Sequence, residues 1–458
     1  MAEPAISLNA VEYTLCHLFR VAFSTVDVPF LAEFGDRCVT VSIENVQIYI
    51  PLMDDATWET FLAGQKKPVL VDNAAGTLKI PVFRCDSGFD GEICKISDHR
   101  IDCSCDLISP AFALLSRYEE FNVYALNLVD WDEHDRIPFE GTLADKYDLV
   151  EIPLADEYAM LLRTWLCQNF PDQFHVAPRT PRVVPTHDID LLYRFDTPVQ
   201  SLKSIFGRDL LINRDLKMVW KSWAGYRAWK QDFYQDPYIQ AILEFAKMEH
   251  AAGLEPVFFF KSLVEGDEDV TYDIRDVRMS RIWKEIKQKG GIVGLHGSYK
   301  SAGEEGRLRM ERKRLESELG TIQETVTAGR QHYLRTFFSD DPNSLDLWQE
   351  AGIIDDYTLG FAERCGFRCG TCHPYPLYDV RNDRVTDIIE HPLIVMDGTL
   401  FDYMKLSVED ARTLTQRLKQ RCFDVEGDFV ILWHNHATTR EFEPYFNSVY
   451  LPLLTNNY

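Results

Sequence analysis

The chain contains 458 residues, of which 46% are hydrophobic and 26% are charged, and it has no low-complexity tract. This composition is typical of a folded globular protein, and the length predicts two or three domains. The formal net charge of −24 at pH 7 disfavours nucleic acids and anionic membranes as partners, because their phosphate groups would be repelled.

The N-terminal residues 1–7 lack both a basic segment and an apolar core, so we expect no secretory signal. No apolar run approaches the length needed to span a bilayer. The eleven cysteines are odd in number, scattered, and part of a chain too large to need disulfides for stability. We therefore expect free, mostly buried thiols and a reducing, cytoplasmic environment.

One group of cysteines requires separate consideration, because Cys365, Cys369, Cys372 and His373 place four soft ligands within nine residues. Such a group could bind zinc. Adjacent Cys372 and His373 are poorly placed to reach one tetrahedral ion, however, and no second Cys-x-x-Cys pair is present. Buried thiols are the favoured interpretation, with a structural zinc site as the alternative.

Residues 1–175 are predicted to form a smaller α+β domain. Helical spacing is found at 10–21, 106–120 and 156–170, strand-like stretches at 38–51, 69–71 and 78–83, and turns at 73–76 and 86–88. No metal-ligand spacing or nucleophile arrangement stands out in this region. Packing, oligomerisation or shaping of a substrate site is therefore its default role.

A linker over 170–185 that contains several prolines ends this unit. After it, predicted strands and helices alternate along the chain. Strand-like runs are predicted at 182–186, 256–260, 291–295, 325–328, 353–357, 366–371, 387–396 and 428–433. Helical runs are predicted at 237–252, 276–289, 304–319, 344–351 and 408–421. This alternation predicts a parallel βαβ domain over 180–458, either open or closed into a barrel.

Residues 191–236 interrupt the alternation with a basic stretch that contains Trp220, Trp223 and Trp229. Basic and aromatic residues together could bind sugars or nucleic acid. A helical insertion that packs its tryptophans against the rest of the domain is favoured, because aromatic residues at this spacing are usually buried.

Ionisable side chains follow several of the predicted strands, and the carboxyl ends of parallel strands meet at one edge of a sheet. These residues are Asp188, Asp190, His296, Arg330, His332, Asp355, Asp356, His434 and His436. A lone histidine after a strand is usually a core residue. Several histidines, an Asp-x-Asp pair and an arginine on the same edge favour a metal-dependent hydrolase site.

On these residues, the region from about 180 to 450 resembles the polysaccharide deacetylase family (carbohydrate esterase family 4). The resemblance implies a distorted (β/α) barrel. It implies that Asp188 is the general base and Asp190 a metal ligand, as in the family's first motif. It also implies that His296 is the metal-binding histidine of the second motif.

The two remaining motifs of the family are similar to Arg330-Gln331-His332-Tyr333 and Leu432-Trp433-His434. The first corresponds to Arg-x-Pro-Tyr with His332 in place of proline. It implies that Arg330 orients the base and that the backbone N–H of Tyr333 binds the oxyanion. The second implies that Leu432 lines the acetyl pocket and that His434 is the general acid.

Lys300 departs from the family pattern, which usually has a second histidine four residues after His296. The motifs then supply Asp190 and His296 as ligands of a divalent metal, with zinc as the first candidate. His332 is our candidate for the third ligand, because it occupies the unusual position of the third motif on the same edge. Catalytic zinc normally has three protein ligands, so Lys300 otherwise indicates an altered substrate, metal-independent chemistry or lost activity.

The function implied by the resemblance is the removal of an acetyl group from an N-acetylated sugar or glycan precursor, with a small molecule or carbohydrate as substrate. Two alternatives stay open: another C–N or ester hydrolase on the same scaffold, and an inactive interaction protein. Residues 1–175, and the stretch 112–120 in particular, resemble an accessory region of some bacterial deacetylase-like proteins, which implies no function for this region.

Overall fold

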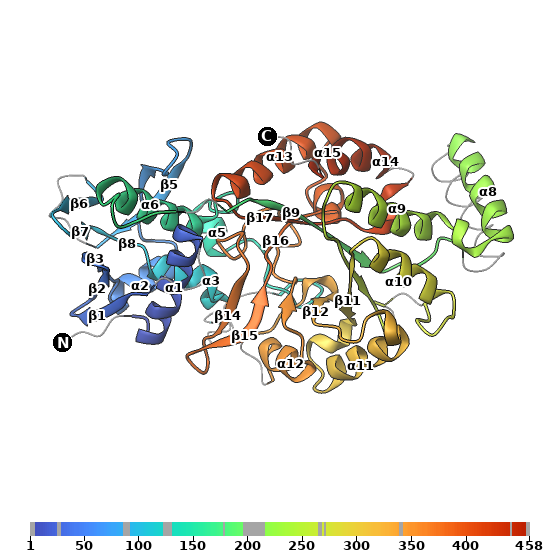
Figure 1. Ribbon diagram of the computed structural model, residues 1–458, viewed down its shortest axis with the longest axis horizontal. Coiled ribbons are helices and arrows are strands. Elements are labelled where there is room, and N and C mark those ends of the chain that lie inside the picture. The colour runs from blue at the N-terminus through green and yellow to red at the C-terminus, as the bar shows by residue number, and fades with distance from the viewer. Residues whose placement is uncertain are drawn as a thin grey trace.

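The structure is a computed structural model that describes residues 5–24, 29–85, 92–121, 131–176, 179–195, 216–263, 268–269, 272–338, 342–439 and 442–454. A curled sheet of nine strands lies at its centre, with helices packed around it (Figure 1). The N-terminal elements form two smaller sheets at one end of the molecule. The predicted turn at 86–88 lies outside the described residues.

The N-terminal part combines helices with a five-stranded and a three-stranded sheet, of order β1-β2-β3-β7-β6 and β4-β5-β8. Its elements are α1 (Leu8–Phe23), β1 (Leu31–Gly35), β2 (Cys38–Ile43), β3 (Val46–Pro51), α2 (Asp55–Leu62), β4 (Val69–Asp72), β5 (Lys79–Arg84), β6 (Cys94–Ser97), β7 (Arg100–Cys103), β8 (Cys105–Asp106), α3 (Ser109–Leu115), α5 (Leu143–Lys146) and α6 (Leu154–Asn169). The strand predicted over 38–51 is in fact a hairpin, because Glu44 adopts a φ of 53° and reverses the chain.

The central sheet has the strand order β14-β15-β13-β12-β11-β10-β9-β17-β16. Its strands are β9 (Arg182–Ile189), β10 (Val257–Phe260), β11 (Ile292–Gly297), β12 (Ala328–Gln331), β13 (Asp355–Asp356), β14 (Tyr375–Asp379), β15 (Arg384–Glu390), β16 (Leu393–Met396) and β17 (Asp428–Leu432). Among the described strands of this central sheet, only β14 and β15 pair in antiparallel orientation. Within these residues β14 and β16 do not pair with each other, so the parallel sheet is confirmed but a closed barrel is not.

The helices that accompany this sheet are α8 (Leu216–Gln231), α9 (Pro237–Ala251), α10 (Met279–Gln288), α11 (Arg307–Leu319), α12 (Ser344–Ala351), α13 (Val408–Asp424), α14 (Glu443–Tyr445) and α15 (Leu451–Leu453). Helix α12 has the predicted bounds because its end signals are strong. Asn343 and Asp346 form a reciprocal capping box at its start, and Gly352 ends it in the left-handed conformation.

Two strand predictions are wrong. Residues 366–371 form turns rather than a strand, and Gly366 there lies so close to the carbonyl of Val150 that a Cβ atom would collide with it. The strand predicted over 387–396 is divided into β15 and β16. Pro392 lies at the division, and it cannot donate a backbone hydrogen bond to a sheet.

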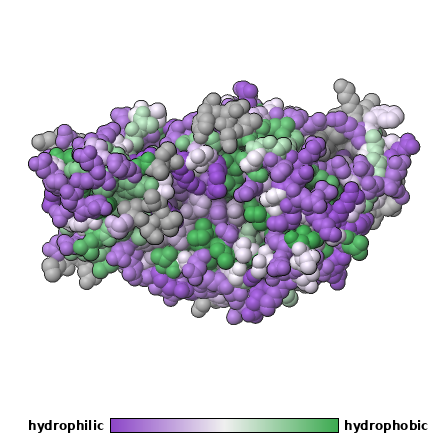
Figure 2. Space-filling view, in the orientation of Figure 1, coloured by the Kyte–Doolittle hydropathy of each residue, from purple (hydrophilic) through white to green (hydrophobic). Residues whose placement is uncertain are grey.

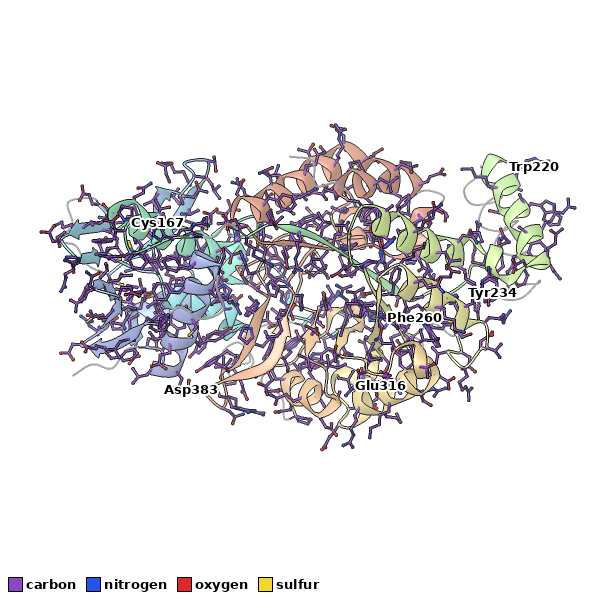
Figure 3. All side chains as sticks on the ribbon, viewed as in Figure 1. Cys167, Trp220, Tyr234, Phe260, Glu316 and Asp383 are labelled. Atoms are coloured by element: carbon purple, nitrogen blue, oxygen red, sulfur yellow. The ribbon has the colours of Figure 1, made fainter. Side chains whose placement is uncertain are left out.

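The tryptophan-rich insertion contains a helix, α8, as predicted, but two of its tryptophans are not packed against the sheet. Trp220 is 74% exposed and Trp223 is 36% exposed, and α8 projects from the body of the molecule (Figure 3). Trp229 instead packs in a small cluster with Phe195 and Tyr226. The aromatic spacing therefore reflects a local cluster rather than a core contact.

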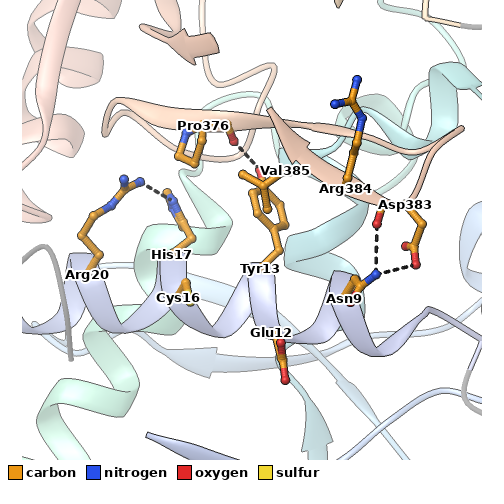
Figure 4. A pocket seen from close by; sticks show the side chains of 10 residues that line it. All are labelled: Asn9, Glu12, Tyr13, Cys16, His17, Arg20, Pro376, Asp383, Arg384 and Val385. Atoms are coloured by element: carbon orange, nitrogen blue, oxygen red, sulfur yellow. Dashed lines mark hydrogen bonds between the residues drawn. The ribbon is translucent and has the colours of Figure 1, made fainter. Parts of the chain in front are cut away.

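Helix α1 joins the N-terminal part to the β14–β15 hairpin, with a cavity between them (Figure 4). The Tyr13 hydroxyl donates to the carbonyl of Pro376 at 2.9 Å, and the Asn9 amide donates to the carbonyl of Asp383 at 3.1 Å. Deeper in the interface, Arg368 donates to the buried carboxylate of Glu120 at 2.9 Å. The two parts thus share buried polar contacts, and the boundary at 175–180 stays a prediction.

The visible face of the molecule is largely hydrophilic, with small hydrophobic groups of residues (Figure 2). This surface agrees with the strongly acidic composition. Within the described ranges, none of the helices combines the length and the hydropathy that a membrane span requires.

A pair of buried carboxyl groups crosses the sheet, where Asp356 on β13 lies in register with Glu390 on β15. Burial raises the pKa of Asp356 to about 6, and burial together with the charge of Asp356 raises the pKa of Glu390 well above its usual value. A raised pKa in the folded state means that folding is favoured below the unfolded pKa. This contribution is lost as the pH rises through about 6.

We predict that Asp356→Asn flattens the pH dependence of stability. Between pH 4 and pH 7, the unfolding free energy of the wild type should fall by roughly 3 kcal/mol more than that of the variant. Urea unfolding at both pH values measures this difference. Asp387→Asn, which removes a carboxylate from the exposed side of β15, is the control. Equal slopes for Asp356→Asn and the wild type would refute the assignment.

Candidate functional site

Six neighbouring strands of the central sheet, from β12 to β16, bring polar side chains to one edge. Asp190 follows β9, His296 lies at the end of β11, and His332 follows β12. Their ligand atoms all lie within 4.8 Å of one another. The Nε2 atom of His296 is 3.3 Å from Asp190 Oδ1, and that of His332 is 3.4 Å from the same oxygen.

Hydrogen bonds on the far side of each imidazole fix how the two histidines are oriented. The Nδ1 atom of His296 donates to the backbone carbonyl of Arg330 at 2.9 Å. The Nδ1 atom of His332 lies 2.9 Å from the buried carboxylate of Asp269. In both rings Nε2 is therefore directed at Asp190. Partners of this kind set the tautomer and orientation of metal-binding histidines.

These donors fit a divalent metal. His296 Nε2 is buried, accepts no hydrogen bond and lies 3.3 Å from Asp190 Oδ1. The Nδ1 atom of His296 is used by the carbonyl of Arg330, and its Nε2 atom faces a carboxylate oxygen, an arrangement that a cation between them would stabilise. Burial lowers the pKa of His332, which keeps this ring neutral as a metal ligand must be. Two histidines and a carboxylate are also a common ligand set for catalytic zinc.

Lys261 lies against the same group, a feature that the sequence analysis missed. Its ammonium group is fully buried, 2.8 Å from Asp190 Oδ1, and donates to His332 Nε2 at 3.1 Å. Burial raises the pKa of Asp190, but the charge of Lys261 and the interactions with the neighbouring histidines lower it by more, so the net pKa lies well below the usual range. Lys261 directly follows strand β10, so its position at a strand end was the available signal.

Asp188 is held by Arg330, as the sequence predicts. The Nη1 atom of Arg330 donates to Asp188 Oδ1 at 2.9 Å, and its Nε atom donates to the carbonyl of Tyr357 at 2.8 Å. Burial raises the pKa of Asp188, whereas Arg330 and His296 lower it by more, so the net pKa lies below the usual value. Asp188 is therefore an ionised carboxylate at neutral pH, able to accept a proton.

His434 has the opposite tendency, because Asp397 supports its protonated form. The Nδ1 atom of His434 bonds to Asp397 Oδ1 at 2.7 Å, and its backbone N–H donates to Asp397 Oδ2 at 2.8 Å. Burial lowers the pKa of His434, but Asp397 and Asp190 raise it well above the usual value. Asp397 was not predicted, although it directly follows strand β16.

A cavity of about 240 Å³ lies over these groups. Its lining contains seven of the eight predicted site residues, namely Asp188, Asp190, His296, His332, Tyr333, Leu432 and His434. Arg330, the eighth, is fully buried behind Asp188. The lining also contains Arg136 from the N-terminal part, which sequence reasoning did not place at the site.

Three other charged residues of the predicted edge do not reach the cavity. Asp355 pairs with His391 at 3.0 Å, and Asp356 faces Glu390. Lys300 is exposed and is absent from the cavity lining. The cation beside the candidate metal ligands is therefore Lys261 and not Lys300.

The predicted alternatives for the cysteines are also resolved in part. All eleven cysteines are free, and six of them are buried. Within the described residues, Cys372 and His373 group with Asp156 rather than with Cys365 and Cys369. Both ring nitrogens of His373 are engaged, with Arg179 and with the carbonyl of Val425, each at 2.9 Å. This group therefore serves chiefly to fasten helix α6 to the 371–373 turn.

Comparison with known proteins gives limited information. Residues 2–171 match a family of unknown function, DUF7033. No curated protein matches the chain. A crystal structure described as a "putative polysaccharide deacetylase from Mycobacterium smegmatis" is similar, with 14% sequence identity and a TM-score of 0.37 over 62% of this chain and 87% of that one. This likeness is too weak to support a function, which rests on the site itself.

We predict that the chain binds Zn²⁺ through the group of Asp190, His296 and His332. Replacing either histidine by glutamine should abolish binding in a calorimetric titration. Asp269→Asn, which removes the partner of His332, should weaken binding about 10- to 100-fold. His391→Gln, a histidine outside the cavity, is the control. Undiminished Zn²⁺ affinity in His332→Gln would show that this residue is not a ligand.

Proposed function

We propose that the protein is a metal-dependent hydrolase that removes an acetyl group from an N-acetylated sugar or glycan precursor. One observation carries this proposal. An ionised carboxylate, Asp188, and a protonated imidazole, His434, line the same cavity with the group of candidate metal ligands. Amide hydrolysis requires one group that accepts a proton from water and one that donates a proton to the departing amine, and the lowered pKa of Asp188 and the raised pKa of His434 leave the two groups in these protonation states.

Each residue then has a defined role. Asp190, His296 and His332 would hold the metal, which when bound supplies a Lewis acid for the acetyl carbonyl and for water. Asp188, held by Arg330, takes the proton from the attacking water. His434, held by Asp397, delivers a proton to the departing amine nitrogen. The backbone N–H of Tyr333 is the proposed donor to the developing oxyanion.

The dimensions of the cavity support a small acyl group. Charged residues line it together with the apolar side chains of Leu432 and Met396. A volume of about 240 Å³ leaves room for an acetyl group and part of one sugar ring. The assignment of a sugar as the remainder of the substrate rests on the sequence motifs and not on this geometry.

The first experiment measures acetate release by the zinc-loaded protein from N-acetylated monosaccharides, with cyclic amides and acetyl esters as competing substrate classes. Release from the sugars alone supports the proposal. Turnover restricted to cyclic amides or esters would instead assign another hydrolase to the same site.

We predict that Asp188→Asn retains Zn²⁺ binding and lowers kcat about 10²- to 10⁴-fold, because the variant has no general base. The measurements are calorimetric Zn²⁺ affinity and steady-state acetate release. Asp402→Asn, which removes an exposed carboxylate from the same cavity lining, is the matched control and should remain active. Unimpaired turnover in Asp188→Asn would make the base assignment wrong.

A non-catalytic protein is the second candidate function, and the position of Lys261 favours it. The ammonium group of Lys261 donates to the Nε2 lone pair of His332 that a metal would use. If Lys261 excludes the metal, the wild type binds no Zn²⁺ and Lys261→Met does. Under the proposed hydrolase function, the wild type itself binds Zn²⁺.

A further inference from the structure

The turn that carries His332 and Tyr333 is conformationally strained. Tyr333 and Leu334 adopt φ values of 60° and 58°, in the left-handed region that residues with side chains rarely occupy. Both residues line the cavity. Such a conformation persists only where the surrounding structure imposes it.

Two arginines exchange hydrogen bonds across the boundary between the N-terminal part and this turn. Arg136 Nη1 donates to the carbonyl of Tyr333 at 3.0 Å. Arg335 Nε donates to the carbonyl of His134 at 2.8 Å. The rings of His134 and Tyr333 stack, with centroids 4.0 Å apart. Residues 131–136 therefore contact the strained turn through hydrogen bonds at Tyr333 and Arg335 and through the stacked ring of His134.

The arginine at the centre of this contact is itself fixed. The carboxylate of Asp132 accepts hydrogen bonds from Arg136 Nε at 2.7 Å and from the backbone N–H groups of Arg136 and His134, each at 2.9 Å. Arg136 Nη2 donates to the Tyr403 hydroxyl at 3.1 Å. All three guanidinium nitrogens thus have protein partners, and the residue is only 8% exposed. This pattern fits a positioning residue better than a substrate-binding one.

We propose that residues 131–136, within the region that matches the family of unknown function, position the 332–335 turn for the chemistry of the site. Arg136 acts through the carbonyl of Tyr333, and thereby on the orientation of His332 and of the Tyr333 N–H. The N-terminal part would then complete the site rather than form a separate module. The expected effect of Arg136 on turnover rests on the proposed function, whereas its expected effect on the conformation of the 332–335 turn does not.

Hydrogen exchange of the full-length protein tests the proposal without a substrate. Arg136→Ala should raise the exchange rate of amides in a peptide spanning 328–338 about tenfold, because a hydrogen bond from a charged group to the turn is lost. Calorimetric Zn²⁺ affinity should fall about tenfold through His332. In acetate release, kcat should fall about 10- to 100-fold with little change in KM.

Arg163→Ala is the matched control, because Arg163 also joins the N-terminal part to the rest of the chain. Its Nη1 atom pairs with Glu426 at 2.9 Å, and it is absent from the cavity lining. This variant should match the wild type in all three measurements. Equal effects of Arg163→Ala and Arg136→Ala on the 328–338 peptide would overturn the proposal, because any interdomain pair would then suffice.

Asp132→Asn provides a milder test that keeps Arg136 in place. A smaller rise in exchange, confined to the same peptide, supports the proposal even if Arg136→Ala fails to fold. Wild-type exchange and Zn²⁺ affinity in both variants would overturn it. A wild type that releases no acetate from any probe would refute the proposed function alone, and the exchange measurements would still decide the role of the segment.

Discussion

The burial of carboxylates at one edge of the central sheet is the constraint on which the site depends. Asp188, Asp269 and Asp397 are buried, and Asp190 lies among them half-buried. An unpaired buried charge is costly, so each carboxylate requires a nearby cation or hydrogen-bond donor. Arg330, Lys261 and His434 meet this requirement from three different strands. The order of the strands therefore places a cation beside each of these carboxylates.

The same pairing of charges gives Asp188 and His434, which line the same cavity, opposite protonation states. Arg330 keeps Asp188 ionised, while Asp397 keeps His434 protonated. An aspartate in water is already ionised at neutral pH, whereas a histidine in water is mostly neutral there, so the fixed partner matters most for the protonation of His434. An acid and a base can then face one cavity without exchanging their proton. The geometry is that of a general acid–base pair beside a group of potential metal ligands.

The strained turn after β12 links this chemistry to the N-terminal part. His332 directs its Nε2 atom toward Asp190 just before the chain turns at Tyr333 and Leu334. The contacts with Arg136 and His134 supply a reason for this conformation, since they bind the carbonyl and the ring of Tyr333. Residues of both parts of the chain therefore contact the turn beside the cavity. The turn also contacts the N-terminal part, because Arg335 donates a hydrogen bond to the carbonyl of His134.

The sequence by itself predicted the parallel arrangement of strands and most of the residues that line the cavity. Buried strands that end in Asp188, His296, Arg330 and His434 must bring those residues to a common edge, because parallel strands share their carboxyl ends. The sequence also indicated His332 as a third ligand. Lys261 and Asp397 follow strands in the same way, but single polar residues at strand ends are too common to be selected by pattern.

Other features were decided only by the tertiary structure. Asp269 and Arg136 come from loops with no periodic pattern, and they reach the site because the chain folds back over long sequence distances. Turns at 366–371 replaced a predicted strand because Gly366 packs against the backbone of Val150. The lack of pairing between β14 and β16 in the described residues and the exposure of Trp220 likewise depend on which surfaces meet. The local sequence indicates which secondary structure each segment prefers. The final conformation and exposure of these residues depend on contacts with segments that are distant along the chain.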